Sequence, residues 1–354
     1  MKKILTPIIS YAIGKAKRNK FVQNLFESPF DLNKFPQMGE FIDSEGNSHT
    51  LLNGLRSKIR PGWERMLKRQ KTNIDNDYLQ KQKSNGEIAV NKILPIIESL
   101  GKSIVNSSVL EIGCHSGGTS YSLAEYGASE VVGTEFSGYK VKAVESDEKK
   151  FKNQLVEVND DLLRIRTRLA ALFKQNKKVK FVDDDICNST LTPSYFDIIC
   201  SWEVLEHLHD TENAFISISK LLKEDGIAIH EYNPFFCLNG GHSLCTLDML
   251  WGHTKLSKSD FEDYLDEIRP NERNKALSFY NEGLNRMTLN DLRTQLEKAN
   301  LEIISIIPFT KEQHLRMIDQ KTLSQTQLHY PKVTLLDLCS PRVYVVTKKT
   351  KHNK

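Results

Sequence analysis

Short apolar runs alternate with helical patterns through the middle of the chain, from residue 108 to residue 233. The runs are rich in Val, Ile and Phe, as buried strands are. The expected strands cover residues 109–112, 130–135, 179–182, 196–201 and 226–231. Residues 211–222 have apolar positions at helical spacing between the last two of these strands. This rhythm predicts an α/β fold, a doubly wound parallel sheet with right-handed crossovers.

The rhythm changes after the fifth strand. Residues 234–286 are aromatic, rich in His and punctuated by Gly, and an insertion at the carboxyl end of a strand is expected to cap the ligand crevice. A helix is expected over 287–300, with Thr288 as its N-cap. Residues 301–308 and 342–347 predict two more strands. The stretch between them is loop-rich and shows no clear crossover helix, so these two strands are expected to pair antiparallel.

The N-terminal part has weaker periodicity than the rest. Residues 1–100 are expected to form a helical extension of a main domain that covers 101–350, and residues 30–46, with Pro and Gly, predict a loop. The first twenty residues combine basic and apolar positions, and Pro7 interrupts the apolar stretch. This pattern predicts either a helix packed on the body of the protein or a weak contact with a membrane surface.

Composition narrows the class of protein. The 354 residues are 39% hydrophobic and 27% charged, with a net charge of +4 that does not require a nucleic-acid partner. No apolar run approaches the ~18–20 residues of a membrane span. The six cysteines lack CxxC pairing and predict buried free thiols in a reducing, cytoplasmic compartment, with peripheral membrane contact as the alternative. Acids and bases are mixed in residues 139–178, which favours a solvated helical face.

A glycine turn follows the first strand, in the sequence SVLEIGCHSGGTS at residues 108–120. Gly113 and Gly117 allow a ligand to approach the backbone closely, and the helix that starts here presents free N–H groups. Glu111 comes directly before the turn. A carboxylate there suits a ligand with an ammonium group better than a pyrophosphate, and it would orient that group directly or through water.

Acidic residues also end the next two strands. Glu135 ends the second strand and is expected to accept hydrogen bonds from both hydroxyls of a ribose. Asp185 follows the third strand and would accept the exocyclic amine of an adenine, while the backbone of Ile186 would contact a ring nitrogen. These roles together describe a nucleoside that carries a charged amino acid.

The stretch from about 105 to 350 resembles the class I S-adenosylmethionine-dependent methyltransferases, and most of all the ubiquinone-biosynthesis-like O-methyltransferase group. The resemblance rests on VLEIGCHSGG, GTEFS, FVDDDI, FDIICSWEVLEHL and LLKEDGIAIHEYNP. It implies a Rossmann-like, seven-stranded sheet with an antiparallel last strand. It also implies S-adenosylmethionine as cofactor, with Trp202 among the residues that bind it. His115 departs from the family, which usually has a middle glycine at that position.

Candidate catalytic residues cluster after the fourth strand. If Glu203, Glu206 and His207 lie on one helical turn, they share a face. They would then bind a divalent ion that activates a substrate hydroxyl, or His207 would act alone as general base. A third interpretation is that the acids only brace the start of a helix. In the cap, the candidate substrate residues are His242, Trp251 and His253.

The preferred function is methyl transfer to an oxygen of a small-molecule, sugar or lipid-linked acceptor. An RNA 2′-O-methyltransferase is an alternative, because a Glu-x-x-Glu-His pattern followed by a later His also occurs in small-RNA methyltransferases. The absence of a clear basic-aromatic patch in the sequence counts against it. A nicotinamide oxidoreductase is disfavoured because the glycines read G-x-x-x-G after an acid. A non-catalytic scaffold has His115 as its only support.

Overall fold

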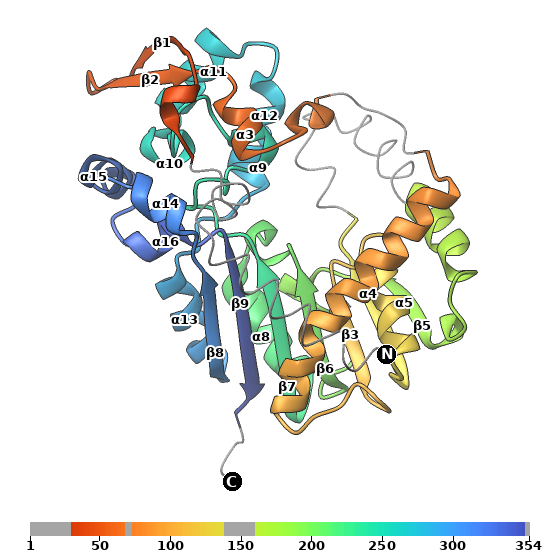
Figure 1. The fold of residues 1–354 in the computed structure, drawn as a ribbon. Coiled ribbons are helices and arrows are strands. Elements are labelled where there is room, and N and C mark those ends of the chain that lie inside the picture. The colour runs from red at the N-terminus through yellow and green to blue at the C-terminus, as the bar shows by residue number, and fades with distance from the viewer. Residues whose placement is uncertain (1–29, 68–72, 138–159, 351–354) are drawn as a thin grey trace, which may run out of the picture.

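A computed structural model describes residues 30–67, 73–137 and 160–350 of the chain. The main sheet has seven strands in the order β5-β4-β3-β6-β7-β9-β8 (Figure 1). Their bounds are β3 (Ser108–Ile112), β4 (Glu130–Glu135), β5 (Val179–Asp183), β6 (Phe196–Trp202), β7 (Leu222–Tyr232), β8 (Leu301–Phe309) and β9 (Arg342–Lys349). Each predicted strand is present, and β7 begins four residues earlier than the predicted start at residue 226, because residues 222–225 are extended rather than a turn.

The topology confirms the predicted fold class. Strands β3 to β7 pair in parallel, and β9 runs antiparallel to both β7 and β8. The winding reverses between β3 and β6, because the chain continues from β3 to β4 on one side and from β6 to β7 on the other. At this point Glu111 of β3 is paired with Cys200 of β6. In open sheets of this kind the crevice for a ligand lies beyond the carboxyl ends of the strands at that point.

Helices cover both faces of the sheet (Figure 1). On one face lie α4 (Asn76–Ser99) and α5 (Gly118–Glu125), and on the other lie α8 (Thr211–Leu221) and α13 (Leu289–Lys298). Alternation along β3 explains both layers, because Val109 joins the core under α4 and α5 whereas Leu110 joins the core under α8 and α13. The predicted cap at Thr288 is confirmed, and with Asp291 it forms a reciprocal capping box.

The cap unit contains more of the chain than the predicted insertion. It includes the two-stranded antiparallel sheet of β1 (Gln37–Ile42) and β2 (Ser48–Leu52), followed by α3 (Leu55–Ile59) and η2 (Trp63–Met66). The insertion itself forms α9 (His242–Cys245), α10 (Gly252–Lys255), α11 (Lys258–Ile268) and α12 (Arg273–Glu282). Between β8 and β9 lie α14 (Glu312–Met317), α15 (Gln320–His329) and α16 (Leu335–Cys339). Single 3₁₀ turns occur at η1 (Leu32–Lys34), η3 (Asn176–Lys178), η4 (Ile186–Asn188) and η5 (Leu205–His207).

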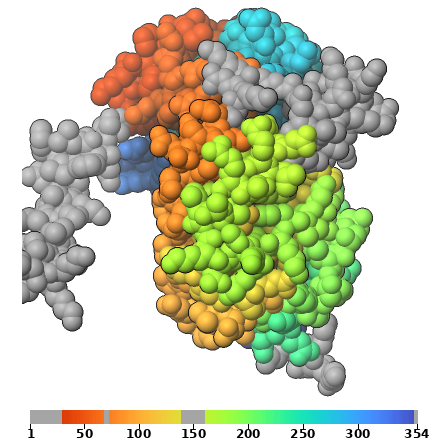
Figure 2. Space-filling model, turned by 90° about the vertical axis from the view of Figure 1, so that its right-hand side faces the viewer, coloured from red at the N-terminus to blue at the C-terminus, as the bar shows by residue number. Residues whose placement is uncertain are grey.

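Two expectations about these segments need correction. The N-terminal extension is not purely helical, because part of the predicted loop at 30–46 is strand β1. Phe41 and Leu51 face inward from the hairpin and share a hydrophobic core with Phe235 and Trp251 of the insertion. Figure 2 shows the hairpin and part of the insertion together at one end of the molecule, above the sheet unit. The stretch between β8 and β9 is helical rather than loop, although the strands do pair antiparallel as expected.

Arg56 of α3, the helix that follows the hairpin, binds the insertion through an ion pair and hydrogen bonds. Its guanidinium donates to both carboxylate oxygens of Glu272, at 2.9 and 2.8 Å, and to the carbonyl of Ser243 at 2.6 Å. Both members of the ion pair are buried. Such a pair is strongly destabilising to break from one side, because a buried charge is left uncompensated.

In the described ranges no helix is both long and apolar enough to span a bilayer. The predicted N-terminal amphipathic segment lies outside the described residues. Residues 139–159 of the predicted charged helix also lie outside them. The rest of that pattern is helical over residues 160–170.

Candidate active site

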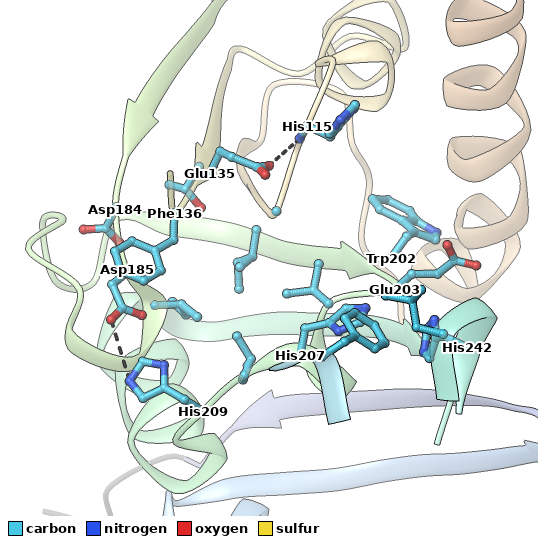
Figure 3. Close-up of a pocket in the computed structure, with 18 of the residues that line it drawn as sticks. His115, Glu135, Phe136, Asp184, Asp185, Trp202, Glu203, His207, His209 and His242 are labelled. Carbon is cyan, nitrogen blue, oxygen red and sulfur yellow. Dashed lines mark hydrogen bonds and ion pairs between the residues drawn. The ribbon is translucent and has the colours of Figure 1, made fainter. Parts of the chain in front are cut away.

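A cavity of about 480 Å³ lies between the carboxyl ends of the central strands and the cap (Figure 3). Its volume is in the range typical of small-molecule and cofactor sites. The lining residues are Met66, Ile112, Gly113, His115, Thr134, Glu135, Phe136, Asp184, Asp185, Ile186, Trp202, Glu203, Val204, His207, Leu208, His209, His242, Ser243, Leu244 and Phe279. Most of the residues predicted for the cofactor therefore surround one cavity.

The glycine turn and the end of β4 form one end of this cavity. Gly113 has a φ of +69°, and a Cβ atom there would lie 2.4 Å from Cγ2 of Val204. The backbone N–H of His115 donates to Oε2 of Glu135 at 2.7 Å (Figure 3). This bond fixes the Glu135 carboxylate beside the turn, at the position expected to hold a ribose.

Asp185 continues the acidic edge from β4 to β5. It is the N-cap of η4, with Oδ1 accepting from the Cys187 backbone at 3.0 Å, and its Oδ2 lies 3.9 Å from Nε2 of His209. Ile186 lines the cavity next to it, and the Phe136 ring projects toward the same end (Figure 3). An apolar ring beside a carboxylate suits a purine base that stacks and donates through its amine.

Glu111 does not line the cavity. It is 4% exposed and lies beneath the turn, where it accepts a hydrogen bond from the Ser120 hydroxyl in the first turn of α5. Burial raises the pKa of Glu111 to about 8, so the carboxyl is largely protonated near neutral pH. Glu111 therefore holds the turn against α5 and does not reach the cavity directly, and its predicted contact with a ligand ammonium through water stays a prediction.

Gly117 is also outside the cavity lining. It is buried, has a φ of +81°, and would place a Cβ atom 2.4 Å from Cζ of Phe181. The packing of Phe181 against the turn, rather than approach of a ligand, explains why a glycine is required there. Of the two predicted glycines, only Gly113 lies on the ligand side.

The other end of the cavity combines the segment after β6 with the start of α9. Glu203 is exposed, adopts a φ of +54°, and accepts from Nδ2 of Asn233 at 3.1 Å. The next residues form the 3₁₀ turn η5 rather than the predicted start of an α-helix. His207 and His242 nevertheless come together, with ring centroids 5.0 Å apart (Figure 3). Trp202 lines the cavity beside Glu203.

Burial controls the protonation of this cluster. It lowers the pKa of His207 and lowers that of His242 well below the usual value, so both imidazoles are neutral near pH 7. It raises the pKa of Glu206, which is 1% exposed, to about 8. Neutral imidazoles at the cavity wall are able to accept a proton or to bind an electrophile.

Two predicted substrate residues lie elsewhere. Trp251 is 1% exposed, and its Nε1 donates to the Leu338 carbonyl at 3.3 Å inside the cap core. His253 is equally buried, and its Nε2 donates to the Phe235 carbonyl at 2.9 Å. Both predictions are corrected, because the cap has its own hydrophobic core and these side chains build it. His242 alone of the three lines the cavity.

The sequence reasoning missed several lining residues. Met66 comes from η2, and Ser243 and Phe279 come from the cap helices. No local pattern marked these three residues, because the folding of the hairpin segment onto the insertion brings them there. Phe136 lies inside the recognised motif GTEFS and His209 directly follows FDIICSWEVLEHL, so the motifs themselves were the available signal.

An open, mostly parallel sheet with a glycine turn after β3 and acids at the ends of β4 and β5 defines a class of α/β enzymes that bind a nucleoside cofactor. A sequence profile described as "Methyltransferase domain" matches residues 59–306, well over half of the chain. The protein therefore belongs to the methyltransferase domain family. Family and motifs together make it a class I S-adenosylmethionine-dependent methyltransferase, and S-adenosylmethionine is its cofactor.

A comparison with solved structures found several methyltransferases at low similarity. An S-adenosylmethionine-dependent methyltransferase from Mesorhizobium loti is 14% identical, covering 72% of this chain and 97% of that one, with a TM-score of 0.41. Phosphoethanolamine N-methyltransferase 2 from Haemonchus contortus is 19% identical. The match covers 74% of this chain and 53% of that one, with a TM-score of 0.41. Geranyl diphosphate C-methyltransferase from Streptomyces coelicolor is 11% identical. The match covers 74% of this chain and 77% of that one, with a TM-score of 0.42. Among curated proteins, the sequence has no match.

Proposed function

We propose that this protein transfers a methyl group from S-adenosylmethionine to an oxygen of a small-molecule, sugar or lipid-linked acceptor. The observation that carries the proposal is the division of one cavity into two chemically different ends. Acids at the ends of β4 and β5 line one end, and a carboxylate with two neutral imidazoles lines the other. The first suits a nucleoside, and the second suits a group that must lose a proton.

The residues at the acidic end of the cavity suit S-adenosylmethionine in their chemistry and their placement. Glu135 is fixed by the His115 backbone, and Asp185 with Phe136 offers a carboxylate and an aromatic face across the same end. Gly113 has no side chain where the backbone borders the cavity. When bound, S-adenosylmethionine supplies an electrophilic methyl group on a sulfonium. The chain's own part is to orient the partners, exclude water and manage the acceptor's proton.

The acceptor end supports an oxygen rather than a carbon as the nucleophile. A hydroxyl must be deprotonated or activated, and Glu203, Glu206 and His207 are the predicted catalytic residues for that task. His207 Nδ1 donates to the Gly283 carbonyl at 2.6 Å, which directs the basic Nε2 nitrogen away from that carbonyl. Phe279 and Leu244 add apolar walls, which suit a ring or chain attached to the hydroxyl.

Calorimetry on the full chain tests the cofactor end. S-adenosylmethionine and S-adenosylhomocysteine should bind and NAD should not. Glu135→Gln should weaken S-adenosylhomocysteine binding by roughly 10- to 100-fold, since hydrogen bonds to a charged group contribute about 1.5–3 kcal/mol. The matched control is Glu130→Gln at the opposite end of the same strand, where the carboxylate pairs with Lys180. Equal affinity of both variants and the wild type would remove Glu135 from the site.

Mass spectrometry then tests the acceptor. The protein is incubated with cell extract and S-adenosylmethionine that carries a deuterated methyl group, and products that gain one labelled methyl are fragmented. The label should be on oxygen of a small or lipid-linked molecule. Label on nitrogen or carbon, or in RNA, would contradict the proposed acceptor while leaving the methyltransferase class intact.

A further inference from the structure

Three metal-ligating side chains converge at the acceptor end of the cavity. They are Glu206 and His207 from η5 and His242, the first residue of α9. One possible ligand atom of each lies within 4.8 Å of the others. The sequence did not connect His242 with the other two as ligands, because only the folded cap brings α9 over η5.

Two of these side chains present buried atoms that are left unsatisfied among the described residues. Oε1 of Glu206 accepts from the Asn233 backbone at 3.2 Å, whereas Oε2 is inaccessible and accepts no hydrogen bond. Nε2 of His242 is likewise inaccessible and has no hydrogen-bond partner. A buried polar atom without a partner costs about 1–3 kcal/mol, so two such atoms at one place indicate a ligand that satisfies both.

The surroundings orient the cluster as metal ligands are usually oriented. His207 donates from Nδ1 to the Gly283 carbonyl, which fixes the tautomer that has its lone pair on Nε2. Asn285 braces the turn that carries the other ligand. Its backbone N–H donates to the Glu206 carbonyl at 2.9 Å, and its Nδ2 donates to the Leu205 carbonyl at 2.6 Å.

We propose that Glu206, His207 and His242 bind one divalent transition-metal ion, with zinc as the reference ion, which leaves a coordination position open to the acceptor oxygen. Two imidazoles and one carboxylate form a ligand set that catalytic zinc uses, with a fourth position for water or substrate. Zinc–ligand distances of about 2.0–2.2 Å place tetrahedral ligands roughly 3.3 Å apart. Small side-chain rotations that contract the present cluster would therefore complete the site.

Charge supports an acceptor that becomes anionic. Glu203 and Glu206 contribute two negative charges once the ion has displaced the proton that burial keeps on Glu206, and the nearby Arg60 guanidinium contributes one positive charge. A divalent ion leaves this group with a net charge of about +1, which one oxyanion neutralises. This step rests on the proposed function. The acceptor's O–H bond breaks, its electron pair stays on oxygen and the proton leaves to water, which makes the acceptor an alcohol or phenol.

A second group of possible ligands provides a matched control. Asp185, Cys187 and His209 also lie within 4.8 Å of one another. Asp185 already caps η4, with Oδ1 accepting from the Cys187 backbone at 3.0 Å, so its carboxylate has a structural role that Oε2 of Glu206 lacks. Binding that depended on His209 would place the ion at this second group instead.

Metal binding to the metal-free full chain, without any cofactor, tests the proposal. Zn²⁺ is titrated by calorimetry, and Co²⁺ is followed by its visible absorption, which reports nitrogen and oxygen ligation. The variants are Glu206→Gln, which keeps the shape of the side chain, and His242→Asn, because Asn tolerates the φ of +52° at that position. His209→Asn is the control. Thermal unfolding of each variant shows whether it is folded.

One ion should bind the wild type and His209→Asn alike, and each of the other two variants should bind at least 10-fold more weakly and lose the Co²⁺ spectrum. Absence of binding to the folded wild type at millimolar metal, or binding lost only in His209→Asn, would overturn the proposal. Calorimetry with S-adenosylhomocysteine is independent of these results. Failure there would refute the proposed function, and loss of metal binding alone would refute only the metal site.

Discussion

Replacing Gly113 by alanine probes the point where the glycine turn meets the acceptor side of the cavity. At a φ of +69° a non-glycine residue costs about 1–2 kcal/mol. The new Cβ would also lie 2.4 Å from Cγ2 of Val204, more than 1 Å inside an ordinary carbon–carbon contact of about 3.5–4.0 Å. Overpacking of this kind costs roughly 1–3 kcal/mol. The expected loss in free energy of unfolding is therefore about 2–5 kcal/mol.

A double-mutant cycle separates the two contributions. Val204→Ala removes the clashing methyl group but leaves the backbone conformation of residue 113 unchanged. The double variant Gly113→Ala/Val204→Ala should therefore be more stable than the sum of the two single changes predicts, by about 1–3 kcal/mol. Urea unfolding gives the free energies, and calorimetry with S-adenosylhomocysteine shows whether the turn still binds. Strict additivity, or a Gly113→Ala variant with wild-type stability and affinity, would refute this account of the turn.

Two further predictions concern buried residues that do not line the cavity. Burial raises the folded-state pKa of Glu111, like that of Glu206, to about 8, above the unfolded value near 4.5. The stability that this proton confers is therefore complete below pH 4.5 and is lost as pH rises toward 8. Glu111→Gln should flatten the decline in urea-unfolding stability between pH 5 and 8, and an unchanged slope would contradict the burial argument. Trp251→Ala should cost about 3–5 kcal/mol in thermal or urea unfolding, whereas His242→Ala at the cavity wall should cost far less. Equal losses of stability in the two variants would contradict the assignment of Trp251 to the core of the cap.

The sheet was predictable because its signal is local. Each strand from β3 to β7 is a short apolar run, and the chemistry-bearing residues follow directly at its carboxyl end, where parallel topology brings them together. Glu135, Asp185 and His207 were found in this way, and all three line the cavity. The prediction required only the order of elements and the rule that places a ligand in an open sheet.

The cap was not predictable by the same means. Its core joins Phe41 of the hairpin to Trp251 of the insertion and Leu338 of α16, three segments far apart in the sequence. Each segment alone has too few apolar positions to show which face it buries. Trp251 and His253 were assigned to the substrate because aromatic and imidazole side chains occur both in binding sites and in small cores. Only tertiary packing distinguishes the two uses, and of these candidates it places His242 at the cavity.

His115 illustrates how a departure from a motif is accommodated. The residue adopts a φ of +42°, in the region that glycine normally occupies, and its side chain is exposed. Its backbone N–H donates to Glu135, and Nε of Arg166 donates to its carbonyl at 2.9 Å. The turn therefore depends on the backbone at this position, in a conformation that costs a non-glycine residue about 1–2 kcal/mol. A histidine here keeps the hydrogen bond from position 115 to Glu135, because the main chain donates it.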